Sequence, residues 1–294
     1  MAPGPIAILG ATSHIARDFA ARFRSRAGAE LHLFGRDAAS RPYSRFGQDK
    51  YAAIINFVGV GDPTRARAMG ADIFSVTREF DLLALNYVRR HPGTRYIFLS
   101  SGAVYGHGFS ECVTADSLAH IPVNALLPQD YYGAAKLYAE ALHRGRAESI
   151  IDIRVFNYIS RSMDLSARFL IADMINAARE GAVFKTSDRP LVRDFLHPAD
   201  FCQLVECCLA APLGANLALD CYSQEPISKE ALVHLMATEF GMRYEITAAV
   251  DIVNATGDKP NYFSCNRRAA ALGYTPAYSS HRAIREEVAA ILSK

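Results

Sequence analysis

Short, continuous runs of hydrophobic residues alternate with amphipathic stretches along the first half of the chain. The runs predict strands at Ile6–Leu9, Glu30–Phe34, Ala53–Val58, Tyr96–Ser100 and Ile150–Phe156. The stretches between them predict helices at Ile15–Arg26, Phe74–Arg90 and Tyr132–Arg144. Strands that are hydrophobic throughout are typical of a parallel sheet whose two faces are both covered by helices. The pattern therefore predicts an α/β fold with a doubly wound parallel sheet and right-handed crossovers.

The pattern loosens after about residue 160. It predicts helices at Ala167–Glu180, Phe201–Leu209, Lys229–Phe240 and Ser280–Ser293, and one further strand at Leu217–Cys221. Loops marked by proline and glycine separate these elements, and the chain has no internal repeat and no low-complexity tract. We therefore expect the second part to fold onto the first.

Composition and charge exclude several classes of protein. The 294 residues include 32 basic and 30 acidic side chains, a net charge of +2. This near-balance argues against nucleic acid or an anionic membrane as the main partner, because both usually require a basic surface. No apolar run is long enough to cross a membrane, and the start of the chain lacks the pattern of a signal peptide. We expect a cytoplasmic protein.

The cysteines agree with a reducing compartment. No two of the six form a C-x-x-C pair and no histidine stands at zinc-finger spacing beside them, so we expect no metal site. We interpret them as small apolar side chains in a reduced protein. They are Cys112, Cys202, Cys207, Cys208, Cys221 and Cys265.

A glycine turn follows the first predicted strand. The segment Gly10-Ala-Thr-Ser13-His-Ile-Ala16 leads directly into a predicted helix, where helix amides could bind a dinucleotide pyrophosphate. Only the first of the three usual glycines is present, so an ordinary structural turn is the alternative. A second glycine, Gly59, stands at the end of the predicted strand that closes with Asn56-Phe-Val-Gly59. Our candidate cofactor-binding residues here are Gly10, Thr12, Ser13, His14, Ile15, Phe57 and Gly59.

Three residues have the chemistry of a proton-transfer site. Tyr132 and Lys136 stand four residues apart on a predicted helix, so their side chains share one face. A nearby ammonium favours the phenolate form of tyrosine and makes it a useful acid or base. Ser101, at the end of a predicted strand, could hold the substrate oxygen that gains or loses the proton. Hydride transfer between an alcohol or ketone and nicotinamide requires these groups, although so short a tyrosine–lysine spacing can also arise by chance.

These motifs together resemble the extended short-chain dehydrogenase/reductase family, the NAD-dependent epimerase/dehydratase group that acts mostly on nucleotide sugars. The resemblance spans nearly the whole chain. Its motifs are the degenerate glycine turn, Leu99-Ser-Ser-Gly-Ala-Val-Tyr-Gly106, Tyr132-x-x-x-Lys136, Arg154-Val-Phe-Asn157, Arg193-Asp-Phe-Leu-His-Pro-Ala-Asp200 and Leu272-Gly-Tyr-Thr-Pro276.

The resemblance implies a Rossmann-type fold and assigns roles to residues. Residues 1–160 would be the dinucleotide-binding domain, to which 191–222 returns, and 161–294 mainly a smaller C-terminal substrate-binding domain. Ser101, Tyr132 and Lys136 would be catalytic, and Tyr132 and Lys136 would also bind the cofactor, Lys136 at its ribose. Ser101, Asn157 and Arg193 would bind the substrate, the last two near its pyrophosphate. A surface ion pair is the alternative for Arg193. We interpret His197 as a structural histidine. Homodimers are common in this family.

Three departures from the family pattern change the expected chemistry. Ser101 is followed by Gly102 and Ala103 and not by the Asp-Glu pair of sugar 4,6-dehydratases, so we do not expect dehydration. The residues after Asn157 differ from the usual Tyr-Gly-Pro, which predicts a reshaped substrate loop. The second predicted strand ends in Gly35-Arg36-Asp37. A glycine followed by arginine suits the 2′-phosphate of NADP, with Arg36 as its ligand, and NAD is the alternative if Asp37 reaches the ribose.

The sequence thus predicts an NAD(P)-dependent oxidoreductase of nucleotide sugars. Hydride transfer would take place at a sugar hydroxyl or ketone, at C4, in a ketoreductase or an epimerase. Two alternatives remain at this stage: a reductase of a free ketone or aldehyde, and a non-catalytic nicotinamide-sensing protein on the same fold.

Overall fold

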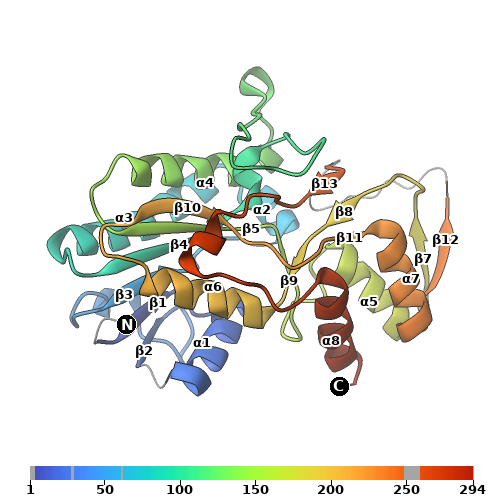
Figure 1. Cartoon of the computed structure of the whole chain (residues 1–294), viewed down its shortest axis with the longest axis horizontal. Coiled ribbons are helices and arrows are strands. Elements are labelled where there is room, and N and C mark those ends of the chain that lie inside the picture. The colour runs from blue at the N-terminus through green and yellow to red at the C-terminus, as the bar shows by residue number, and fades with distance from the viewer. Residues whose placement is uncertain (1–3, 28–29, 61, 248–258, 294) are drawn as a thin grey trace.

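A six-stranded parallel sheet forms the centre of the molecule in a computed structural model that describes residues 4–27, 30–60, 62–247 and 259–293 (Figure 1). Every strand pair in this sheet is parallel. The strand order is β10-β5-β4-β3-β1-β2. The strands are β1 (Ile6–Leu9), β2 (Leu31–Phe34), β3 (Ala53–Asn56), β4 (Arg95–Ser101), β5 (Ile150–Val155) and β10 (Asn216–Asp220).

Helices cover both faces of the sheet, as the sequence predicts. On one face α1 (His14–Ala27) and α6 (Pro198–Ala210) enclose a core that includes Phe19, Phe23 and Phe201. On the other face α3 (Asp72–Arg90) and α4 (Pro128–Arg144) pack over Tyr96 and Phe98 (Figure 1). A short helix, α2 (Pro63–Met69), lies against α4. The prediction of a doubly wound α/β fold is confirmed.

The remaining helices surround a second hydrophobic core. They are α5 (Leu170–Glu180), α7 (Lys229–Phe240) and α8 (Ser280–Leu292). The other strands of the described chain form three small sheets, ordered β11-β8-β13, β12-β7 and β6-β9. They are β6 (Asn157–Tyr158), β7 (Val183–Thr186), β8 (Val192–Arg193), β9 (Phe195–Leu196), β11 (Ile227–Ser228), β12 (Arg243–Ile246) and β13 (Asn261–Tyr262). Four 3-10 helices complete the described chain: η1 (Tyr43–Arg45), η2 (Gly102–Tyr105), η3 (Val123–Ala125) and η4 (Arg268–Leu272).

The predicted elements agree with the observed ones except at their ends. The strand β3 stops two residues early, because the Val58 amide donates to the Asn56 side chain at 2.9 Å. The two-residue strands are too short for a hydrophobic period to reveal them. The strand β10 pairs with β5, so part of segment 191–222 joins the sheet, while the domain boundary at residue 160 stays a prediction. Among the described helices, none has the length and apolar character needed to span a membrane.

The cysteines differ from expectation in one respect. Cys112 and Cys265 form a disulfide, although 153 residues separate them. Their segments meet at an isolated parallel bridge, where the Cys265 amide donates to the Val113 carbonyl at 2.7 Å. The expectation of a fully reduced protein is therefore wrong for this pair, because a tertiary contact brings the two thiols together. The other four cysteines are not in a disulfide, and Cys202, Cys208 and Cys221 are buried as expected.

Candidate active site

The turn after β1 forms a tight cradle at the start of α1. Gly10 has a φ of +76°, and a Cβ there would lie 2.8 Å from the Val58 nitrogen. Glycine is therefore required both by the backbone conformation and by the close approach of the chain after β3. The Ser13 hydroxyl accepts the Ala16 amide at 3.2 Å and so caps the helix. An anion such as a pyrophosphate fits the N-terminus of a helix held in this way.

The other predicted residues of this loop contribute unequally. Thr12 packs beside Gly35, and burial lowers the pKa of His14, whose ring lies 5.8 Å from that of Tyr158. Phe57 is buried in the hydrophobic core, and the partly buried Ile15 packs against that core. The cofactor-binding role of these two residues stays a prediction.

The end of β2 leaves no room for an acidic residue. A Cβ at Gly35 would lie 2.7 Å from the Ser40 hydroxyl oxygen and 3.1 Å from the Thr12 methyl carbon. Arg36 and Asp37, by contrast, are both exposed at the surface next to the cradle. Arg36 and Asp37 are therefore the two charged side chains that this turn presents to solvent.

Ser101 and Tyr132 are brought together by close packing between η2 and α4. A Cβ at Gly133 would lie 2.4 Å from the Ala103 carbonyl oxygen, so glycine allows the helix to approach the turn that follows β4. The Ser101 hydroxyl accepts the Ala103 amide at 3.2 Å. Burial raises the pKa of Tyr132, and a hydrogen bond with Ser101 offsets part of this rise. The predicted pair of serine and tyrosine is therefore assembled.

Lys136 lies one turn further along α4 and is buried. Its ammonium donates to the Leu99 carbonyl at 2.7 Å and lies 5.9 Å from the centre of the Tyr132 ring. Burial lowers the pKa of Lys136 to about 8, although nearby carboxylates oppose the change. A Cβ at Gly59 would lie 3.4 Å from the Lys136 nitrogen, so the exposed glycine after β3 borders the lysine.

One electrostatic expectation is wrong. The sequence predicts that the ammonium lowers the pKa of Tyr132, whereas the pKa is raised. Burial of the phenol is the largest cause, because a phenolate loses more hydration than a neutral phenol. A side chain at position 102 would clash in this structure, since a Cβ at Gly102 would lie 2.4 Å from the Phe156 ring.

Sequence reasoning missed Tyr262, which completes this cluster. Its hydroxyl lies 3.4 Å from the Ser101 hydroxyl oxygen, and burial raises its pKa. It belongs to β13, which pairs with β8 and so places Arg193 next to it. The signal that could have located it is weak: a lone tyrosine in a segment without hydrophobic periodicity.

Arg193 and Asn157 lie in the strands beside this cluster. Arg193 is buried and does not lie at the surface. Its guanidinium donates to the carbonyls of Val192 and Pro260 at 2.8 and 3.3 Å, and burial lowers its pKa to about 10. The Asn157 side chain donates to the Asp194 carbonyl at 3.1 Å and so ties β6 to the end of β8.

The residues after Asn157 connect two helices. The Tyr158 hydroxyl donates to Asp18 of α1 at 3.1 Å, and the Arg161 guanidinium donates to Glu287 of α8 at 2.7 Å. Glu287 also lies 3.3 Å from His197, which accepts the Ala199 amide at the start of α6. His197 is therefore a structural histidine, as predicted.

A sequence model described as the NAD dependent epimerase/dehydratase family matches residues 6–216. The chain belongs to this family. No curated protein sequence matches the chain. The match includes Gly10, Ser101, Tyr132, Lys136 and Arg193, and so covers the whole assembled cluster except Tyr262.

Two solved structures illustrate the fold that this family member shares with known proteins. UDP-glucose 4-epimerase from Thermotoga maritima, solved with UDP-glucose, is 14% identical, with a TM-score of 0.81 and coverage of 98% of this chain and 99% of that one. RMD from Pseudomonas aeruginosa, complexed with NADPH, is 18% identical, with a TM-score of 0.77 and coverage of 99% of both chains. At this identity the likeness concerns the fold.

Proposed function

We propose that this protein transfers hydride between a nicotinamide cofactor and C4 of a nucleotide sugar. The observation that carries the proposal is the assembly of Ser101, Tyr132 and Lys136 beside the exposed Gly59. These residues come from β4, α4 and the loop after β3, and they meet at the carboxyl ends of the parallel strands. This is the place where α/β sheets bind their ligands.

The residues of the site fit a dinucleotide. Gly10 opens the cradle at the start of α1, and Gly59 leaves space next to the Lys136 ammonium. When bound, the nicotinamide would accept or supply the hydride. Tyr132 would take up or return the proton at its phenol oxygen, and Ser101 would hold the sugar oxygen in hydrogen-bond reach of it. With a pKa of about 8, Lys136 is mainly charged at neutral pH. Its ammonium would stabilise the Tyr132 phenolate once a substrate oxygen replaces part of the hydration that the phenol loses on burial.

The assignment of a nucleotide sugar is supported by the second part of the chain. Arg193 is buried within the same group of side chains as Tyr262, which contacts Ser101. A guanidinium that is already stripped of water binds a diphosphate strongly. A free ketone would need no such group. The family match and the structural likeness to nucleotide-sugar enzymes agree with this proposal.

Replacing Arg193 by alanine should raise the KM for the nucleotide sugar and leave the affinity for cofactor almost unchanged. A charged hydrogen bond to phosphate corresponds to a change of about 10- to 150-fold. Steady-state kinetics and cofactor titration measure the two quantities, and R193K should lie between wild type and R193A. Equal KM values for wild type and R193A would indicate a substrate without a diphosphate.

We further propose that the cofactor is NADP and the reaction a ketone reduction. The support is the packed Gly35, which excludes an acidic side chain, and the exposed Arg36 beside it.

We expect tighter binding of NADPH than NADH, and R36A should weaken NADPH binding about ten-fold with little change for NADH. Fluorescence titration of the reduced cofactors measures this. D37N is the control: a loss of NADH affinity in this variant would assign the ribose contact to Asp37 and favour NAD.

Mass spectrometry of nucleotides retained by the purified protein separates reductase from epimerase. An epimerase keeps its nicotinamide through the whole cycle, whereas a reductase must exchange it after each turnover. We expect little retained cofactor and consumption of NADPH with a 4-keto sugar nucleotide. Stoichiometric retained NAD, together with interconversion of two sugar epimers, would instead assign the protein as an epimerase.

A further inference from the structure

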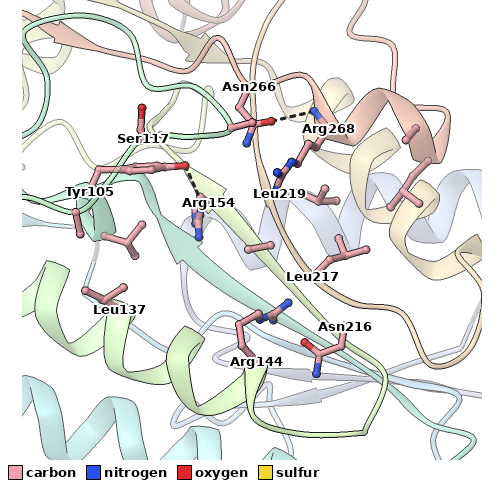
Figure 2. A pocket seen from close by; sticks show the side chains of 16 residues that line it. Tyr105, Ser117, Leu137, Arg144, Arg154, Asn216, Leu217, Leu219, Asn266 and Arg268 are labelled. Carbon is pink, nitrogen blue, oxygen red and sulfur yellow. Dashed lines mark hydrogen bonds between the residues drawn. The ribbon is translucent and has the colours of Figure 1, made fainter.

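A cavity of about 640 Å³ lies along the outer edge of the sheet, apart from the proposed active site (Figure 2). Its floor is the edge strand β10, and its walls come from the end of α4, from η4 and from the segment 115–119. Ser101, Tyr132 and Lys136 do not line it. Its size is that of a site for a small molecule.

Three guanidinium groups surround this cavity. Figure 2 shows the side chains of Arg144, Arg154 and Arg268 on different sides of one space. Arg144 is paired with Asp152, and Arg154 with Glu140.

Arg268 differs from the other two arginines. It is exposed, and among the described residues its guanidinium has no ion-pair or hydrogen-bond partner. Its backbone is nevertheless held, because its amide donates to the Asn266 side chain at 3.1 Å (Figure 2). The cavity therefore has one positive charge that remains available to a ligand.

The rest of the lining combines apolar side chains with the polar groups of Tyr105, Ser117, Asn216 and Asn266. Leu137, Leu217 and Leu272 provide hydrocarbon walls. The amide nitrogen of Asn216 donates to the carbonyls of His143 and Arg146, whereas its buried Oδ1 has no hydrogen-bond partner. The cavity thus combines one unpaired positive charge with an apolar surface.

We propose that this cavity binds a phosphorylated small molecule with an apolar ring. The phosphate would lie at Arg268, because carboxylates already neutralise Arg144 and Arg154 and a guanidinium group matches phosphate oxygens in charge and geometry. The ring would pack on the leucines. This site is separate from the one in the proposed function, so either could fail without the other.

The network around the cavity leads toward the proposed active site. Glu140, the partner of Arg154, accepts a hydrogen bond from the Ser100 hydroxyl at 2.6 Å, one residue before Ser101. Glu140 also belongs to α4, the helix that carries Tyr132 and Lys136. A ligand that draws Arg154 toward itself would therefore act on the element that positions the proposed catalytic groups.

Calorimetric titration at low ionic strength, with phenyl phosphate and inorganic phosphate as probes, tests the site. Wild type should bind phenyl phosphate more tightly than phosphate, and R268A should weaken phenyl phosphate about ten-fold or more. The matched control is R267A, since Arg267 is also exposed but lies over the Tyr222 ring and does not line the cavity. Equal binding by wild type and R268A overturns the proposal, as does a loss of binding in R193A alone, which would place the probe at Arg193.

A second measurement locates the probe without removing a charge. The sequence contains no tryptophan, so A271W introduces a single tryptophan, which can be excited selectively, at an exposed position that lines the cavity. We expect its emission to change on addition of phenyl phosphate. A270W is the matched control, because Ala270 is exposed on the same 3-10 helix but outside the lining. An equal response in both variants, or none in A271W, contradicts the proposed location.

Discussion

Replacement of Tyr132 by phenylalanine is expected to lower turnover by about 10²- to 10⁴-fold, the usual contribution of a general acid or base. The change removes only the phenol oxygen and keeps the ring that packs near Lys136, so the thermal midpoint of unfolding should hardly change. Steady-state kinetics on a 4-keto sugar nucleotide or its alcohol, together with a thermal melt, measure both quantities.

Two neighbouring tyrosines provide matched controls for this prediction. Tyr131 lies on the same helix and packs against Phe74, with ring centres 5.6 Å apart, so Y131F should keep its turnover. Tyr262 is the competing candidate, because its hydroxyl lies 3.4 Å from that of Ser101. If Y262F loses turnover while Y132F retains it, the acid/base role belongs to Tyr262 and our assignment is wrong.

Replacement of His143 by alanine is expected to lower the free energy of unfolding by about 3–5 kcal/mol, the cost of leaving buried charge without its partner. His143 is fully buried between two carboxylates, with Nδ1 2.7 Å from Asp152 and Nε2 2.8 Å from Asp81. Chemical denaturation measures the loss. An exposed histidine of α7 is the control, and H234A should change stability little.

The same histidine predicts how stability depends on pH. Burial by itself lowers the pKa of His143, but the hydrogen bonds to Asp152 and Asp81 outweigh it and raise the pKa to about 9 from its usual 6.5. A pKa raised by folding stabilises the native state fully below pH 6.5, and this contribution is lost as the pH rises through about 9. Wild type should therefore lose stability between these limits more steeply than H143A. Parallel profiles for the two proteins would show that His143 is not charged in the folded state.

The sequence by itself determined the order of the main strands and helices along the chain. It also determined three of the side chains in the proposed site. Continuous hydrophobic runs identify buried parallel strands because both faces of such strands are covered. Ser101 follows one of these strands, and Tyr132 and Lys136 are four residues apart on one helix, so local geometry is sufficient to place them. Gly10 could be located for the same reason, since the turn between β1 and α1 requires a positive φ.

Only the tertiary structure decided which distant residues join that local pattern. Tyr262 lies 161 residues from Ser101, and Cys112 lies 153 residues from Cys265, and no period or spacing links residues so far apart. The raised pKa of Tyr132 and the charged state inferred for His143 likewise depend on burial and on carboxylates from other elements. Short-range sequence patterns record backbone preference and hydrophobic period, whereas desolvation and long-range contacts exist only after the chain has folded.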